Sequence, residues 1–213
     1  MKSIILLIAL IMTACTNYSD SNGNTDLVVT PINSQFQSYV ASFTTEAAAN
    51  GYDVSKFSQV KLGIDFGTPD GSTTIGYCTT NKRQSQVIIN PIYWNSTSFT
   101  DVDRKALIYH ELGHCLLFKG HQAETFRIQF TNSDGIFEYK NTAVSLMSPT
   151  LVTMTFQSNE LSYLGQVLMP NYYIPEIFKA IGTDMGLTGT AGANAVTDPN
   201  ANIVGSDYNL IRK

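Results

Sequence analysis

All three histidines of this 213-residue chain lie within twelve consecutive positions, from 110 to 121. His110 and His114 are four residues apart, so on a helix their rings leave the same face. Such a pair can hold one metal ion, and Glu111 beside them can handle a proton. Gly120 allows the chain to turn, which would bring His121 back as a third ligand. The cluster therefore predicts a metal-binding helix that the rest of the chain must bury and orient.

The neighbours of this histidine pair are uncharged, namely Leu107, Ile108, Leu112, Gly113, Cys115 and Leu116. A surface helix that carried two histidines by chance would not have such neighbours, so we expect the pair to be buried. Neutral imidazoles suit Zn²⁺, and three protein ligands leave one coordination position open for water, as catalytic zinc sites require. In that arrangement Glu111 is the general base and not a ligand.

This pattern resembles the metzincin branch of the zincin metallopeptidases. That branch has the motif His-Glu-x-x-His-x-x-Gly-x-x-His, followed downstream by a tight turn that contains a methionine. The resemblance covers about residues 75–150. It implies zinc ligands at His110, His114 and His121, the base at Glu111 and the turn methionine at Met147. It also implies an α+β fold, with a mixed N-terminal sheet, an active-site helix and a small C-terminal subdomain.

The chain departs from this motif in two places. The glycine of the motif falls at Leu117, and the third histidine comes one residue late; a helix with one extra turn before Gly120 would absorb the shift. Pro149 stands where some members have a tyrosine two residues after the turn methionine, so no tyrosine is assigned to the oxyanion. The alternative role for Met147 is to fill a gap in the core.

A glutamate from a later helix is the alternative third ligand, as in other zincins. The candidates are Glu124, Glu138 and Glu160. None of them lies in a segment with a convincing helical pattern, so His121 is the preferred ligand.

The first fifteen residues predict a secretory signal. A short positive start precedes an apolar run from Ile4 to Met12, which is too short to span a membrane as a helix. Small residues then lead directly to Cys15. This resembles a bacterial lipoprotein signal and implies that Cys15 is lipidated and anchors the chain in the cell envelope. The alternative is an ordinary signal peptide in which the cysteine has no role.

The remaining chain predicts one domain between two less ordered segments. Residues 16–30 are rich in Ser, Asn, Asp and Gly and predict a flexible tether, while 186–213 predict a loose tail. The metallopeptidase domain would occupy 31–185. Within it, periodicity predicts helices over 31–50, 101–119 and 172–185, strands over 60–66, 75–79 and 87–90, and further strands and loops over 125–160.

Composition excludes some partners. Thirteen Lys and Arg against 17 Asp and Glu give a net charge of −4, which offers no basic patch for nucleic acid and no polybasic surface for a membrane. The 11 Tyr and 11 Phe are typical of a folded domain.

Besides Cys15, the chain has two cysteines, Cys78 and Cys115. In a secreted protein this pair invites a disulfide that joins the strand at 75–79 to the active-site helix. The alternative is two buried reduced thiols, since free cysteine packs well as a small hydrophobic residue.

The segment 87–90 comes just before the active-site helix. In the resembled branch an edge strand at this place holds the substrate as an added antiparallel strand, and an exposed edge offers free backbone groups to an extended peptide. The alternative is an ordinary interior strand.

Together these features predict a secreted, membrane-anchored zinc metalloendopeptidase that acts on a peptide or protein substrate. Two other functions stay open. One is a non-catalytic zinc-binding surface lipoprotein, against which Glu111 argues because a structural zinc site needs no base. The other is a zinc amidase that acts on cell-wall peptides.

Overall fold

A computed structural model describes residues 27–68, 74–81, 83–131, 137–149, 168–179 and 209–211. The predicted signal with Cys15 lies outside the described residues, as does most of the predicted tail. The described helical elements are η1 (Ser34–Phe36), α1 (Gln37–Ala49), η2 (Val54–Gln59), α2 (Pro91–Trp94), α3 (Asp101–Leu117), η4 (Met169–Tyr173) and α5 (Ile174–Ile177). The described strands are β1 (Lys61–Phe66), β2 (Gly76–Asn81), β3 (Gln84–Ile89), β4 (Thr125–Thr131), β5 (Phe137–Ala143) and β6 (Asn209–Ile211). The chain is thus an α+β protein, as predicted.

The first sheet is mixed and has the strand order β1-β3-β2. β1 runs parallel to β3, and β2 runs antiparallel to it. β3 is therefore the central strand, with Val87 and Ile89 fully buried. The expectation of an edge strand over 87–90 is wrong and its interior alternative is confirmed, because β3 has hydrogen-bonded partners on both sides.

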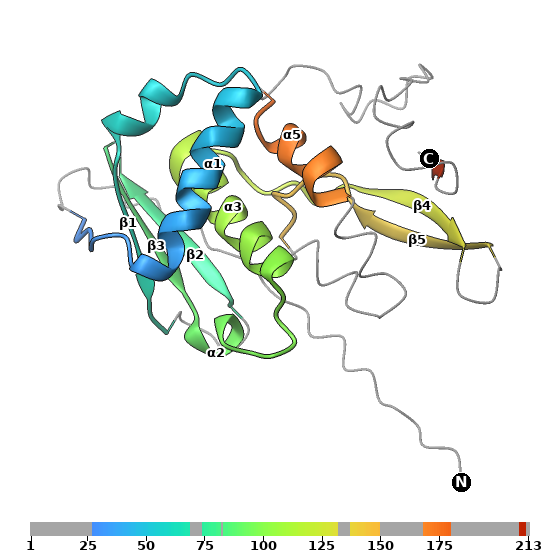
Figure 1. Cartoon of the computed structure of the whole chain (residues 1–213), viewed down its shortest axis with the longest axis horizontal. Coiled ribbons are helices and arrows are strands. Elements are labelled where there is room, and N and C mark those ends of the chain that lie inside the picture. The colour runs from blue at the N-terminus through green and yellow to red at the C-terminus, as the bar shows by residue number, and fades with distance from the viewer. Residues whose placement is uncertain are drawn as a thin grey trace, which may run out of the picture.

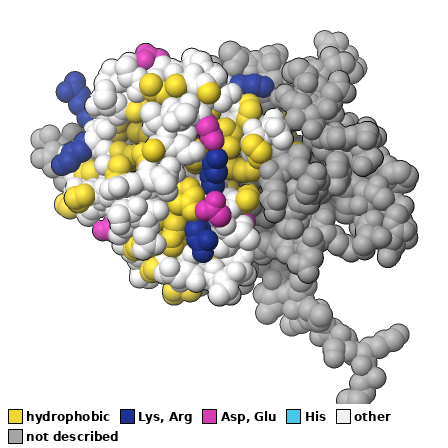
Figure 2. Space-filling view, viewed as in Figure 1, with side chains coloured by type: hydrophobic (Ala, Val, Ile, Leu, Met, Phe, Trp, Pro, Cys, Tyr) yellow, Lys and Arg dark blue, Asp and Glu magenta, His cyan; other side chains and the backbone are white. Residues whose placement is uncertain are grey.

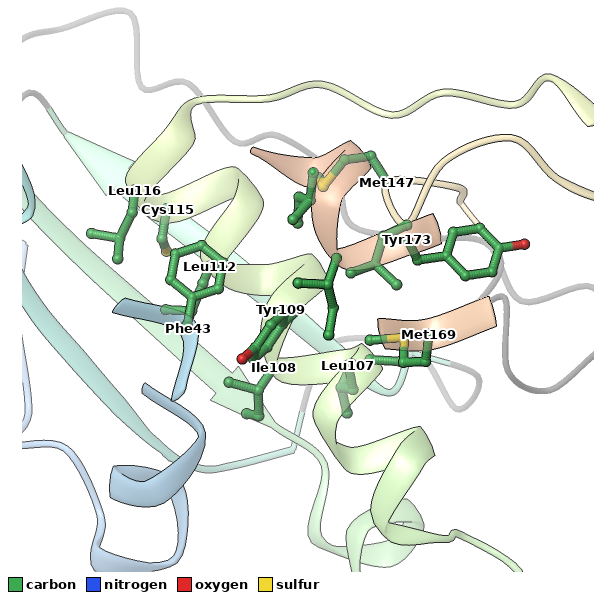
Figure 3. Close-up of a cluster of buried hydrophobic side chains, with 14 of the residues drawn as sticks. Phe43, Leu107, Ile108, Tyr109, Leu112, Cys115, Leu116, Met147, Met169 and Tyr173 are labelled. Carbon is green, nitrogen blue, oxygen red and sulfur yellow. The ribbon is translucent and has the colours of Figure 1, made fainter. Parts of the chain in front are cut away.

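Two long helices lie side by side against this sheet (Figure 1). Phe43 of α1 packs edge-on against Tyr109 of α3, with ring centroids 5.0 Å apart, and against Phe178 at 4.9 Å. Figure 3 shows Tyr109 and other apolar side chains of α3 in one cluster with Phe43 of α1 and with Met169 and Tyr173 of η4. This apolar packing buries residues 106–116 of α3. The apolar neighbours of His110 and His114 in the sequence predict this burial.

The start of α3 is fixed by local hydrogen bonds. The Thr100 hydroxyl accepts from the backbone N–H of Asp103, and the Asp103 carboxylate accepts from the backbone N–H of Thr100 at 2.8 Å. This reciprocal pair satisfies two backbone donors at the helix N-terminus. The predicted start near 101 is therefore confirmed.

The second sheet has the order β5-β4-β6 and is antiparallel. Its strand β6 lies within the segment 186–213 that the sequence predicts as a tail. After β5 the chain is held by the helical segment 168–177. Tyr172 donates to the Val144 carbonyl at 2.9 Å and Tyr173 to the Ala143 carbonyl at 2.8 Å. The helix predicted over 172–185 begins earlier than expected, with η4 at Met169, and α5 ends at Ile177, earlier than the predicted end.

The ordered chain also begins earlier than the composition of the tether suggests. The backbone N–H of Leu27 donates to the Gln84 side chain at 3.1 Å, and that of Thr30 donates to the Gln86 side chain at 2.8 Å. Gly63 leaves room for this segment, because a Cβ there would collide with the Thr30 carbonyl. Residues 27–30 are thus held along the sheet.

The visible surface has no dominant charge. Figure 2 shows Lys and Arg mixed with Asp and Glu on the face toward the viewer, among uncharged side chains. In the part of the chain that the structure describes, no helix has the length and apolar character needed to cross a membrane.

Candidate metal centre

The rings of the three histidines lie together beside the C-terminal half of α3, which contains His110 and His114. The Nε2 atom of His114 lies 3.1 Å from Nε2 of His110 and 3.1 Å from Nε2 of His121. The ligand atoms of all three lie within 4.8 Å of one another. His110 and His114 are buried, and His121 is half-buried. The structure therefore brings together the three residues that the sequence singled out.

The other ring nitrogens show which atoms face the centre. Nδ1 of His110 lies 2.8 Å from the Leu146 carbonyl, and Nδ1 of His114 lies 2.6 Å from the Lys119 carbonyl. A carbonyl only accepts, so both Nδ1 atoms carry the proton, and a neutral imidazole has only one. The Nε2 atoms then bear lone pairs that point at one another. Two such lone pairs at 3.1 Å repel, unless a cation lies between them.

The same burial keeps the rings neutral. It lowers the pKa of His110 to about 3 and that of His114 to about 4, and in His110 the charge of His114 adds to the effect. Burial also lowers the pKa of His121. Near pH 7 the three imidazoles are therefore unprotonated, which is the form that binds a metal.

This shift predicts the pH dependence of the metal-free protein. The pKa in the folded state lies below the unfolded value of about 6.5, so below that pH the unfolded chain binds protons that the folded chain does not. Stability should fall as the pH drops from about 6.5 toward 4, by up to about 1.4 kcal/mol per pH unit for each of His110 and His114. Denaturant unfolding in the presence of a chelator measures it. The double variant His110→Gln/His114→Gln should show a shallower fall; equal slopes would contradict the assignment.

The end of α3 brings His121 back to the site. Phe118 has φ 53° and ψ 34°, in the left-handed region, and its N–H bonds to the Gly113 carbonyl, as does that of Lys119 at 3.0 Å. The expected turn at Gly120 is wrong. Gly51 is the only glycine of the described residues with a positive φ, and a Cβ at Gly120 would meet nothing within 4 Å.

The helix accordingly has no extra turn. It ends at Leu117, two residues before the predicted end. The reversal at Phe118 turns the Lys119 carbonyl toward Nδ1 of His114 and leaves three residues to reach His121. A third histidine that comes one residue late in the sequence can therefore still reach the cluster.

Met147 is fully buried beside α3 (Figure 3), and its sulfur lies next to Gly113. A Cβ at Gly113 would collide with the Met147 sulfur, so this glycine leaves the space that the methionine fills. The Met147 carbonyl accepts from the backbone N–H of Gln122 at 2.9 Å. The segment around Met147 thus supports both α3 and the stretch that contains His121. The structural role of Gly113 has no distinct signal in the sequence.

Glu111 is 1% exposed and follows His110 on α3. Its Oε1 atom lies 3.1 Å from the place that a Cβ would take at Gly76, the first residue of β2. A larger residue at position 76 would crowd this carboxylate. Within the described residues no carboxylate joins the histidine cluster. Of the alternative ligands, Glu124 is exposed, the side chain of Glu138 is not described, and Glu160 lies outside the described residues.

A disulfide joins Cys78 of β2 to Cys115 of α3, with a Cα–Cα distance of 5.8 Å. The carbonyl of Cys115 also accepts a hydrogen bond from the Ser85 hydroxyl of β3 at 3.1 Å. Cys115 directly follows His114, so the sheet is tied to the helix beside a candidate ligand.

Sequence reasoning missed Glu176, which the structure links to the cluster through Leu146, the residue whose carbonyl accepts from Nδ1 of His110. This residue of α5 is 6% exposed and accepts hydrogen bonds from Ser145 and from the backbone N–H of Leu146. Burial raises its pKa, and the positive charge of Lys119 opposes that rise. An acidic residue inside the apolar run of the closing helix was the one available signal.

No protein-family model, curated protein or solved structure matches this chain.

Proposed function

We propose that the chain is a zinc-dependent metallopeptidase with a metzincin-like site, in which His110, His114 and His121 hold the ion. The observation that carries the proposal is the convergence of three imidazole Nε2 atoms, of which those of His110 and His114 bear lone pairs and no proton. Tetrahedral Zn²⁺ with Zn–N distances of about 2.0–2.1 Å needs ligand nitrogens roughly 3.3–3.4 Å apart. The two Nε2 separations of 3.1 Å that involve His114 lie about 0.2–0.3 Å below this value.

A bound zinc ion supplies a Lewis acid that acidifies water and polarises a carbonyl group. Glu111 is the group that accepts the proton of the attacking water, since it adjoins His110 on the same helix. Its burial removes competing solvent, and its place beside Gly76 keeps the carboxylate next to β2. The base and the ligands are thus held by one helix.

The test is the metal content and activity of the purified protein. We expect one Zn²⁺ per chain, hydrolysis of peptides that a chelator abolishes and added Zn²⁺ restores, and weaker metal binding in His121→Ala. Gly120→Ala is the matched control, because position 120 has space for a methyl group. A structure in which His121 points away and a glutamate completes the metal sphere would contradict the metzincin-like assignment.

The same experiment separates the rival functions. A protein that binds Zn²⁺ but cleaves nothing in a broad peptide library would be a non-catalytic zinc-binding lipoprotein. Cleavage of purified peptidoglycan without cleavage of protein substrates would indicate an amidase of cell-wall peptides. The adjacent glutamate favours catalysis over simple storage of the metal.

The proposed location follows from the sequence alone. The apolar run of the predicted signal ends at Met12, small residues lead from it to Cys15, and lipidation of Cys15 would hold the enzyme at the surface of a bacterial membrane. The substrate would then be a peptide or protein of the cell envelope or its surroundings.

A further inference from the structure

Glu176 is a buried acid that the proposed chemistry does not use. It lies on α5, far along the chain from the histidines, and is 6% exposed. A buried carboxylate is costly unless hydrogen bonds and charge compensate it. The groups that donate hydrogen bonds to Glu176 therefore indicate its role.

Those partners belong to the segment that contains Met147. The Ser145 hydroxyl lies 3.0 and 2.9 Å from the two carboxylate oxygens of Glu176. The backbone N–H of Leu146 donates to the same carboxylate at 3.2 Å. The Ser145 oxygen in turn accepts from the backbone N–H of Met147 at 3.0 Å. One carboxylate thus orients two successive peptide groups.

The second of these peptide groups reaches a candidate ligand. The carbonyl of Leu146 and the N–H of Met147 belong to the same planar unit. That carbonyl accepts from Nδ1 of His110 at 2.8 Å. The path from acid to ligand is therefore Glu176 to Ser145, then the peptide between Leu146 and Met147, then the ring.

The other two histidines are supported close by. The Met147 carbonyl holds the N–H of Gln122, the residue after His121. The Lys119 carbonyl accepts a hydrogen bond from Nδ1 of His114. The ammonium group of Lys119 donates to the Lys179 carbonyl at 3.0 Å, and its positive charge favours the charged form of Glu176. The supports of all three rings therefore meet around one buried acid.

We propose that Glu176 is a positioning residue of the metal centre, which sets the tautomer and the orientation of His110 through Ser145 and Leu146. This inference rests on the proposed function, since it assumes that His110 is a ligand. Groups that orient a ligating histidine typically change metal affinity by about 10–100-fold when they are replaced. Glutamine keeps the shape of the side chain but removes its negative charge and replaces one acceptor oxygen by a donor, so the charge-assisted hydrogen bonds from Ser145 and Leu146 weaken.

The experiment measures the dissociation constant of Zn²⁺ by competition with a chromophoric chelator, together with the absorption spectrum of the Co²⁺-loaded protein. We expect Glu176→Gln to raise the dissociation constant by about 10–100-fold and to shift the Co²⁺ bands, because the ring of His110 turns. Ser145→Ala should change both in the same direction. The double variant should add little to Glu176→Gln, because both residues act on one path. The exposed Asp53→Asn is the matched control and should change neither, since asparagine keeps the cap of η2 and Asp53 is not in the histidine cluster.

The outcomes are distinct. If the parent protein binds Zn²⁺ through the three histidines but Glu176→Gln keeps the parental affinity and Co²⁺ spectrum, the positioning role is wrong and the metal centre stands. If the parent does not bind Zn²⁺ through these histidines, the proposed function falls and the inference with it. Should Glu176→Gln fail to fold, Ser145→Ala decides, and parental values in that variant would overturn the role.

Discussion

Replacing Glu111 by glutamine should lower peptide hydrolysis by roughly 10²–10⁴-fold, which is the usual contribution of a positioned general base. Glutamine keeps the size and the hydrogen-bonding capacity of the side chain, and the space beside Gly76 is unchanged. It cannot accept a proton from the attacking water. Because Glu111 is not a ligand in the proposed site, Zn²⁺ should stay bound and the fold should stay intact. Turnover and metal stoichiometry measured on the same sample test both parts.

The contrasting variant is His114→Ala. It removes the ring whose Nε2 lies 3.1 Å from those of both other histidines, so metal affinity and activity should fall together. Loss of metal in Glu111→Gln, or near-parental turnover on every substrate that the parent cleaves, would show that Glu111 is not the base.

Removing the disulfide should lower the free energy of unfolding by about 4 kcal/mol in the chain-entropy model, since it closes a loop of 37 residues. The double variant Cys78→Ala/Cys115→Ala is the preferred test, because a serine would place a hydroxyl group in a buried position. Denaturant unfolding with saturating chelator separates this effect from that of a bound metal. Addition of a reductant should destabilise the parent by a similar amount and leave the double variant unchanged.

The disulfide lies close to the candidate site. It ties β2, where Gly76 lies against Glu111, to the helix residue after His114. An unfolding free energy equal to that of the oxidised parent would contradict the prediction. Measured under the same conditions, Ser85→Ala is a control for the neighbouring contact between β3 and the Cys115 carbonyl.

The parts of the molecule that local patterns determine were predictable from the sequence. The spacing of His110 and His114 is a property of one helix, and so is the capping pair of Thr100 and Asp103 that sets its start. The mixed character of the fold follows from separate helical and alternating segments in the same way.

Features set by distant contacts were not predictable. The order of the strands makes β3 central, and no pattern within 87–90 reveals how many partners it has. Glycine adopts positive φ at least cost, which favours a turn at Gly120, whereas two backbone hydrogen bonds to the Gly113 carbonyl hold the turn at Phe118 instead. Glu176 meets the 145–147 segment across some thirty residues of sequence, which no local rule can anticipate.

His121 differs from the other two histidines in its attachment. It stands in residues 118–124, which form neither helix nor strand, and it is half-buried, whereas His110 and His114 are buried on a regular helix. Local openings of such a stretch need far less free energy than unfolding of a packed helix. In the proposed site His121 would be the first ligand to dissociate from the metal and the last to bind it again. The lifetime of the loaded state would then follow the rate at which this short stretch opens, and the overall stability of the protein would matter little to it.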